Sequence, residues 1–212
     1  MRSPPGWKPW PVRFMETIEH RLKQYLAWRQ VHHIVDDCRV PSAVLLPLYR
    51  KEGQLHLLFT KRTEKVSTHK GQVSFPGGTY CSCDKTLAET ALRESCEEIG
   101  LFPRDVEVMG RLDDNCSNAS NYTISPFVGS IPYPYEFKLN HDEAERIIEV
   151  PIPALLEHSH IRQDVEIICG KTVATYFYHY GSDIIWGATA RILHQFLDIF
   201  AGLGEGQESK VA

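Results

Sequence analysis

The sequence has no apolar run close to the roughly 18–20 residues that a membrane-spanning helix requires, so we expect no contact with a bilayer. Prolines interrupt the N-terminal region where a secretory signal would carry its apolar stretch, which indicates a cytoplasmic protein. The six cysteines fit no disulfide framework, and no Cys-x-x-Cys pair is present to indicate zinc. The spacing of Cys81-Ser82-Cys83 favours two simple loop cysteines over a metal or redox pair.

The sequence also lacks an excess of positive charge, because it has 23 Lys and Arg residues and 27 Asp and Glu residues, which give a net charge of −4. This balance argues against nucleic acid as the main partner, although a local basic patch could still bind a phosphorylated small molecule. With 212 residues, 42% of them hydrophobic and 24% charged, the chain has the composition of a globular protein. The length suits one domain with an N-terminal extension.

The periodicity of the apolar residues predicts a mixture of helices and strands. Helices are expected at residues 15–30, 86–99 and 183–202, with a helical turn at 152–157, and strands at 40–49, 55–61, 73–75, 106–112, 123–131, 145–151, 165–168 and 173–180. Gly100 ends the second helix, and Pro76-Gly77-Gly78 ends a short strand in a turn. Many strands with three helices predict an α+β sandwich, a mixed sheet flanked by helices. We expect an arm and amphipathic helix over 1–34, one domain over 35–203 and a tail over 204–212.

The predicted helix over 86–99 carries three carboxylates on one face. At about 100° per residue, Glu94, Glu97 and Glu98 fall within about 100° of one another. The opposite arc, which would pack on the sheet, holds Ala88, Leu92, Ser95, Cys96 and Ile99. One reading is a solvated acidic face. However, Glu94 and Glu98 are like charges at i,i+4, and a hard divalent cation such as Mg²⁺ or Mn²⁺ would turn their repulsion into coordination.

Two neighbours of these carboxylates fit a metal site. Arg93 lies four residues before Glu97, so we expect it to orient that carboxylate. Upstream, Gly77 and Gly78 allow the backbone to approach a ligand closely, and the bare carbonyl of Gly78 is a candidate further ligand of the metal.

A cationic segment precedes the two glycines in this otherwise acidic chain, and it holds Lys61, Arg62, Lys65 and Lys70. Such a segment is either a solvated loop or, beside a metal-binding helix, a binding site for a substrate with several phosphates. His69, His141 and His179 are further candidates for polar contacts.

The helix and the glycines together resemble the Nudix box, with Arg93, Glu94, Glu97, Glu98, Gly100 and Leu101 in matching positions. Three departures are visible. The interval from Gly78 to Arg93 is one residue longer than in the general box, Lys85 with Asp84 beside it stands where the first Glu is expected, and Ser95 takes an apolar position. The resemblance implies a Nudix-type α/β/α sandwich that hydrolyses diphosphates with Mg²⁺ or Mn²⁺ on Glu94, Glu97 and Glu98.

A longer resemblance, over roughly residues 40–200, is to the coenzyme A pyrophosphatase branch of that family. Segments 57–62, 69–78, 121–129 and 185–191 carry it, together with the longer interval before Arg93. Two positions depart from the pattern, because Thr63 and Ser67 stand where that branch has Ser and Arg. The resemblance implies that coenzyme A, or an acylated form, is cleaved to 3′,5′-ADP and 4′-phosphopantetheine. The residues expected to bind the substrate are Lys61, Arg62, Lys70, Gly77 and Gly78.

The resemblance also assigns Glu143, in the acidic cluster over 142–145, as a residue that reaches the metals or activates water, against the alternative of a surface loop. The general base is either Glu98 or Glu143. Two other functions stay open: hydrolysis of another nucleoside diphosphate derivative, such as ADP-ribose or a dinucleotide, and a sensor that binds a nucleotide without cleaving it. The intact glutamate trio argues against the sensor. A homodimer is allowed, and nothing in the sequence requires it.

Overall fold

The computed structural model describes residues 17–36, 38–65, 70–117, 121–157, 161–168 and 171–205. The expected N-terminal arm, residues 206–212 of the expected tail, Ser67 and His69 lie outside these residues. The elements are α1 (Ile18–Trp28), β1 (Val40–Lys51), β2 (Gln54–Arg62), β3 (Val73–Ser74), β4 (Gly77–Thr79), α2 (Leu87–Ile99), η1 (Pro103–Asp105), β5 (Glu107–Arg111), β6 (Asn115–Ser117), β7 (Tyr122–Ser130), β8 (Ala144–Pro151), α3 (Ile152–Leu156), β9 (Ile161–Ile168), β10 (Lys171–Tyr180), β11 (Asp183–Ile185) and α4 (Gly187–Glu205). None of the helices in these residues combines the length and apolarity needed to span a membrane.

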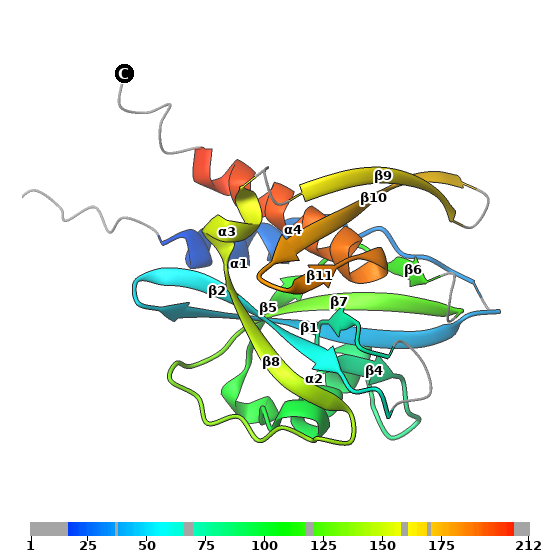
Figure 1. Ribbon diagram of the computed structural model, residues 1–212, viewed down its shortest axis with the longest axis horizontal. Helices are drawn as coiled ribbons and strands as arrows, with labels where there is room; N and C mark the ends of the chain where they lie inside the picture. The colour runs from blue at the N-terminus through cyan, green and yellow to red at the C-terminus, as the bar shows by residue number, and fades with distance from the viewer. Residues whose placement is uncertain are drawn as a thin grey trace, which may run out of the picture.

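A mixed sheet of eight strands forms the centre of the molecule, with β3, β2, β1, β7 and β5 side by side (Figure 1). β1 and β2 form a tight hairpin and are therefore antiparallel. On its other edge, β1 runs parallel to β7. β4 pairs with β1 on the same edge as β2, and β8 pairs with the other edge of β2. A second sheet is made of the antiparallel strands β9, β10 and β11.

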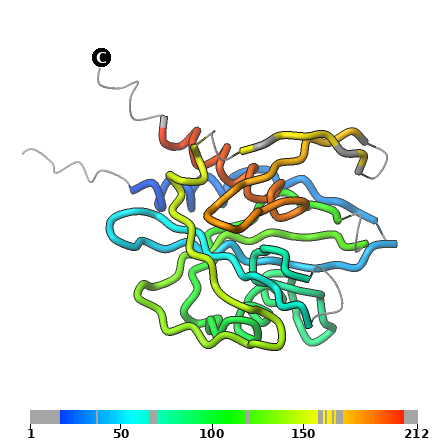
Figure 2. The backbone as a smooth tube through the Cα atoms, in the orientation of Figure 1, coloured from blue at the N-terminus to red at the C-terminus, as the bar shows by residue number. Residues whose placement is uncertain are grey.

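Helices cover both faces of the central sheet, which confirms the expected α+β sandwich. Figure 1 shows α2 on one face and α1 and α4 on the other. The core is accordingly divided in two, with Leu46, Leu57 and Phe59 facing the α1–α4 side and Leu45 and Leu58 facing the α2 side. Figure 2 shows that the first and last helices, far apart in sequence, lie close together in space.

Two expectations about local structure were wrong. Gly77 and Gly78 do not form a turn, because they belong to β4, which pairs with Ser42–Val44. A Cβ on Gly77 would lie 2.3 Å from the carbonyl oxygen of Ala43, so the lack of a side chain is what lets this strand approach β1. The last helix begins at Gly187 and not at 183, because Asp183–Ile185 pair with β10 across a tight turn.

The segment after α1 is held to the body of the molecule by Asp113. One carboxylate oxygen accepts hydrogen bonds from Arg29 Nη2 (2.7 Å) and from the backbone N–H of His32 (2.9 Å), and the other accepts one from Gln195 Nε2. Burial alone would raise the pKa of Asp113, but these hydrogen bonds and the charge of Arg29 outweigh it and keep the pKa below its ordinary value.

We expect Asp113→Asn to lower the free energy of unfolding by about 1–3 kcal/mol at neutral pH, because three donors lose an ionised acceptor. A lowered folded-state pKa means that the stabilisation is complete above the unfolded-state pKa of about 3.9 and is lost as the pH falls through the folded-state pKa. Urea unfolding between about pH 3 and pH 7 should therefore show a gap between the two proteins that narrows below about pH 4. Glu145→Gln, which changes an exposed carboxylate on β8, is the control. A gap that does not depend on pH would contradict this account.

Candidate active site on helix α2

Helix α2 has well-defined ends that fix the direction of its carboxylates. At its start, Thr86 Oγ1 accepts a hydrogen bond from the backbone N–H of Glu89 (3.2 Å), and at its end Gly100 adopts the left-handed conformation with φ 69°. Ser95, which stands at an apolar position, is fully buried and donates its hydroxyl to the carbonyl of Ala91 (2.7 Å). The helix therefore accepts a serine on its packed face without an unsatisfied polar group.

Strand β4 passes so close to α2 that Gly78 lies against Glu94. A Cβ on Gly78 would lie 2.3 Å from Glu94 Oε2, so any other residue would displace this carboxylate. Burial raises the pKa of Glu94, and the charges of Glu97 and Glu143 add to the rise, while Arg93 opposes it. Gly78 thus lies beside Glu94, and it does so from a strand and not from the expected turn.

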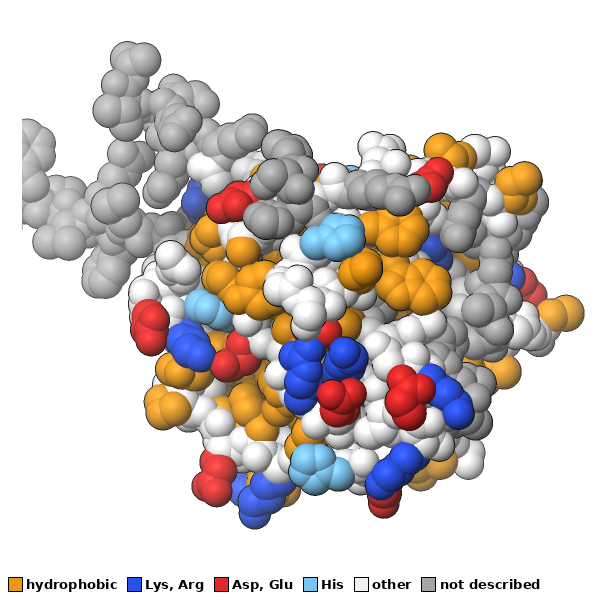
Figure 3. Space-filling model, viewed as in Figure 1, with side chains coloured by type: hydrophobic (Ala, Val, Ile, Leu, Met, Phe, Trp, Pro, Cys, Tyr) orange, Lys and Arg blue, Asp and Glu red, His pale blue; other side chains and the backbone are white. Residues whose placement is uncertain are grey.

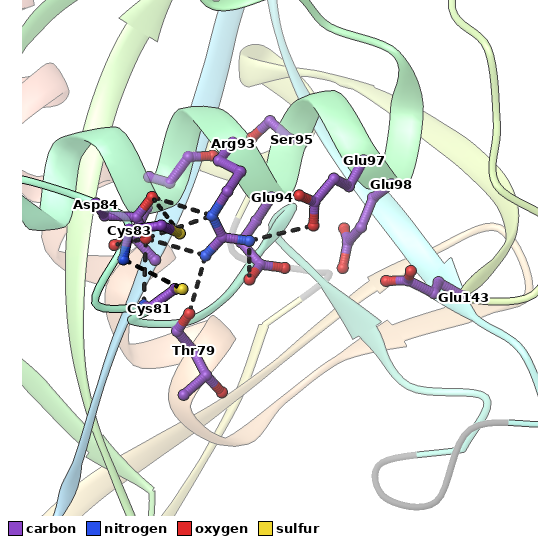
Figure 4. Close-up of polar contacts among 12 residues, drawn as sticks. Thr79, Cys81, Cys83, Asp84, Arg93, Glu94, Ser95, Glu97, Glu98 and Glu143 are labelled. Carbon is purple, nitrogen blue, oxygen red and sulfur yellow. Dashed lines mark hydrogen bonds and ion pairs between the residues drawn. The ribbon is translucent and has the colours of Figure 1, made fainter.

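Arg93 joins the loop before α2 to the glutamates (Figure 4). Its Nε and Nη2 each lie 3.0 Å from an oxygen of Asp84, and its Nη1 donates to Glu94 Oε1 (2.8 Å) and to Glu97 Oε2 (3.1 Å). Nη2 also donates to the carbonyl of Thr79 (3.1 Å). The hydrogen bonds from Arg93 lower the pKa of Asp84 to about 2. The contact expected between Arg93 and Glu97 is present.

Glu98 does not lie on an exposed acidic face, which corrects the sequence-based expectation. Its side chain is only 4% exposed, whereas that of Glu97 is 53% exposed. Burial raises the pKa of Glu98 to about 8, and Glu143 and Glu94 add to the rise. The charge of Arg62, whose Nη1 lies 3.8 Å from Glu98 Oε1, and the backbone N–H of Gly77 oppose it. Gly77 of β4 and the side chain of Arg62, at the end of β2, lie beside this carboxylate, which helical periodicity alone does not reveal.

Glu143 approaches the same place from the loop before β8. Asn140 holds this loop on the end of α2, because its backbone N–H donates to the carbonyl of Glu98 (2.8 Å) and its Nδ2 donates to Glu143 Oε1 (3.0 Å). The carbonyl of Glu143 accepts the N–H of Thr63 (3.1 Å). In Figure 4 the carboxylates of Glu94, Glu97, Glu98 and Glu143 point into one region.

This donor set fits a hard divalent cation. As placed in the described residues, no group of three or more Asp, Glu, His or Cys side chains could hold a metal ion, and Arg93 holds one oxygen each of Glu94 and Glu97. Glu98 Oε2 is buried without a hydrogen-bond partner among those residues. A buried carboxylate oxygen without a donor is costly unless a cation or proton binds it. Carboxylate oxygens are also the ligands that Mg²⁺ prefers.

The expected cationic segment is divided between the two faces of β2. Arg62 faces Glu98, whereas Lys61 lies directly opposite Arg146 of β8 and points to the other face. Lys61 Nζ donates to Asp183 Oδ1 (3.3 Å), and Arg146 Nη2 donates to Asp183 Oδ2. Burial would raise the pKa of Asp183, but these two cations hold it below its ordinary value.

The remaining cations and histidines lie on the surface. Lys65 pairs with Asp142 at 3.3 Å, with both side chains largely exposed, and Lys70, His141 and His179 are exposed. Figure 3 shows charged side chains of both signs next to one another near the centre of one face of the molecule. A pocket of about 520 Å³ opens beside Arg146, and its lining includes Tyr133, Tyr135, Phe137, Glu149 and Tyr180.

The roles of three residues were not predicted from the sequence: Asp84, which was named only as the neighbour of Lys85, and Arg146 and Asp183 on the other face of β2. Asp84 had a signal, because an acidic residue is expected at the neighbouring position 85. Arg146 and Asp183 had none, because their pairing joins β8 to β11, two strands that are 37 residues apart in sequence at this contact.

Comparison with known proteins places this geometry in a family. The NUDIX domain model matches residues 39–162. An uncharacterized Nudix hydrolase NudL from Photorhabdus laumondii is 37% identical over 73% of this chain and 81% of its own. A NudL protein from Salmonella heidelberg, also uncharacterized, is 32% identical over 84% of this chain and 92% of its own.

Among solved structures, the fold is similar to that of a MutT/nudix family protein from Enterococcus faecalis, with a TM-score of 0.54 and 16% identity over 89% of this chain and 72% of that one. The fold is therefore the Nudix fold, with a mixed sheet between helices. Nudix enzymes are hydrolases that typically depend on a divalent metal. By the extent of the domain match and the identity to its relatives, the chain belongs to the Nudix hydrolase family.

Proposed function

We propose that the protein hydrolyses the diphosphate bond of coenzyme A or its acylated forms to 3′,5′-ADP and 4′-phosphopantetheine or its acyl form. The observation that carries the proposal is the arrangement of charge around β2. Four carboxylates gather on one face of this strand, and the Lys61–Arg146 pair lies on the other. Coenzyme A carries a diphosphate and a separate 3′-phosphate, so it needs both a metal site and further cations.

The carboxylates divide into groups that hold a cation and groups that move a proton. Glu94, Glu97 and Glu98, with the carbonyl of Gly78, would hold Mg²⁺ or Mn²⁺. Such an ion supplies charge neutralisation of the diphosphate oxygens and a lower pKa for the water that it binds. Arg93 keeps Glu94 and Glu97 in place, and Glu98 or Glu143 accepts the proton of the attacking water.

The substrate's own charge is balanced by residues outside this group. Arg62, beside Glu98, is in place to contact a diphosphate oxygen, and its side chain is 25% exposed. Asp183 fixes the positions of Lys61 and Arg146, so both cations are presented together. A phosphate that approaches this pair meets two positive charges and one negative charge. We assign the third phosphate of the substrate to this pair, and a substrate that carries only a diphosphate lacks that group.

Removing single carboxylates tests the catalytic assignment. We expect Glu97→Gln and Glu98→Gln each to lower kcat by about a hundredfold or more at saturating Mg²⁺, because an amide is a poorer metal ligand and a poorer base. Circular dichroism should show folded protein in both cases. Glu136→Gln, which changes an exposed glutamate outside the site, is the matched control and should keep its full activity. Turnover near that of the wild type in both site variants would remove these residues from the mechanism.

Removing the metal tests the cation site itself. An excess of EDTA should abolish activity, and added Mg²⁺ or Mn²⁺ should restore it. Mn²⁺ should also raise the melting temperature of the metal-free protein, since a ligand that binds only the folded state stabilises it, and this rise should be lost in Glu98→Gln. Full activity in a preparation shown to be free of metal would contradict the proposal.

The choice of substrate is tested by deleting the 3′-phosphate. If Lys61 and Arg146 bind it, kcat/KM for 3′-dephospho-coenzyme A should be lower than for coenzyme A by about ten- to a hundredfold, the value of one charge-assisted hydrogen bond. Lys61→Gln and Arg146→Gln should shrink this preference and change the rate on ADP-ribose less. Arg104→Gln, which removes an exposed cation on η1, should not affect it. Equal kcat/KM on the two coenzyme A forms, with ADP-ribose cleaved as fast, would indicate a Nudix hydrolase of broader specificity.

A further inference from the structure

Two exposed cysteines lie next to each other in the loop between β4 and α2 (Figure 4). The backbone N–H of Cys83 donates to the sulfur of Cys81 (3.3 Å), and the backbone N–H of Asp84 donates to the carbonyl of Cys81 (2.9 Å). The loop therefore folds back on itself, and the backbone of Cys83 lies against the sulfur of Cys81. The other cysteines of the described residues, Cys38, Cys96 and Cys116, are single residues in separate elements or loops.

This loop is connected to the glutamates of α2 through one carboxylate. Asp84 accepts hydrogen bonds from the backbone N–H of Cys81 (3.2 Å) and from the thiol of Cys83 (3.8 Å to sulfur), and it also binds the guanidinium of Arg93. Arg93 in turn holds Glu94 and Glu97. A change in the shape of the loop is thus transmitted to the metal-binding carboxylates through two side chains.

The two thiols differ chemically. The side chain and the backbone N–H of Cys83 lower the pKa of the Cys81 thiol, whereas the Cys81 side chain raises the pKa of the Cys83 thiol. The thiolate is the reactive form of cysteine towards oxidants. Geometry and charge therefore make Cys81 the attacking group, with Cys83 beside it as the thiol that resolves the product.

We propose that Cys81 and Cys83 form a peroxide-sensitive dithiol, and that their oxidation to a disulfide lowers hydrolase activity by displacing Asp84 from Arg93. The Cys81 thiolate attacks one oxygen of hydrogen peroxide, the O–O bond breaks, and hydroxide leaves and is protonated to water. Cys83 then attacks the sulfur of the resulting sulfenic acid, the S–S bond forms, and a second water leaves with the Cys83 proton. One peroxide is reduced, two thiols are oxidised, and a thiol reductant reverses the change.

Formation of the disulfide alters the contacts of Arg93, because the ring that Cys81 and Cys83 close is small and ends next to Asp84. A disulfide across a single intervening residue constrains the backbone from Cys81 to Cys83, and Asp84 is the next residue. The hydrogen bond from the Cys83 thiol to Asp84 is lost on oxidation, because that thiol no longer has a proton. Asp84 then keeps fewer of the contacts that place it against Arg93, and the guanidinium is less well held beside Glu94 and Glu97.

The proposal rests on the hydrolase activity of the family and on the metal site, and it does not depend on coenzyme A as the substrate. The test compares the full-length wild type with Cys81→Ser, Cys83→Ser and the matched control Cys38→Ser, which removes an exposed single cysteine. Each protein is treated with hydrogen peroxide and then with dithiothreitol. Peptide mapping locates any disulfide, activity is measured on coenzyme A and on ADP-ribose, and Mn²⁺-induced thermal stabilisation is measured without substrate.

In the wild type and Cys38→Ser we expect a Cys81–Cys83 disulfide, a fall in kcat of about tenfold or more that dithiothreitol reverses, and a smaller Mn²⁺-induced rise in melting temperature. Cys81→Ser and Cys83→Ser should keep their basal activity and lose this reversible response. A disulfide to Cys38, a formed Cys81–Cys83 disulfide with unchanged activity and Mn²⁺ response, or equal reversible loss in the serine variants would each overturn the proposal. Failure of the coenzyme A assignment would instead appear as low turnover of coenzyme A before oxidation, with the disulfide and the Mn²⁺ readouts intact.

Discussion

The guanidinium of Arg93 is the interaction on which the geometry of the site depends. It binds Asp84 through two nitrogens, Glu94 and Glu97 through a third, and the carbonyl of Thr79 at the end of β4. Arginine alone offers several donors in one rigid plane, so a single side chain can hold a loop, a strand end and a helix together. Without its charge, Glu94 and Glu97 would repel one another, and both would lose the donor that holds one of their oxygens.

The burial of Glu98 is an energetic cost of this arrangement. Its carboxylate is buried beside Gly77 of β4 and Arg62, with one oxygen unpaired among the described residues, and its pKa is raised to about 8. A buried acid of this kind destabilises the fold unless a proton or a cation accompanies it. Strongly perturbed acids gather at functional sites more often than elsewhere. Glu97, by contrast, lies on the surface of the same helix, and Arg93 is the one ion-pair partner of its side chain within the part of the chain that the structure describes. The two glutamates are neighbours in sequence, and the packing of β4 is what makes their environments different.

The position of β2 extends the site across the sheet. The register between β2 and β8 shifts between Lys61 and Arg62, and the two side chains face opposite sides. Arg62 therefore joins the carboxylates, while Lys61 joins Arg146 and the buried Asp183 of β11. Asp183 of the second sheet thus orients Lys61 and Arg146, which stand on two strands of the first sheet. The chain beyond β8 therefore contributes directly to the distribution of charge around β2.

Local sequence patterns located the main helices, most of the strands and the chemical groups of the site. Helix α2 could be located from its apolar period, from Thr86 before it and from Gly100 after it, because caps and periodicity are properties of short stretches of backbone. The same holds for the β1–β2 hairpin and for the face shared by Glu94 and Glu97. The tertiary structure alone decided that Glu98 is buried, that the glycine pair is a strand against β1, and that Lys61 is held by Asp183, 122 residues away. Each of these depends on which surfaces meet across the chain, and residue spacing carries no information about distant partners until the sheet and its helices have packed.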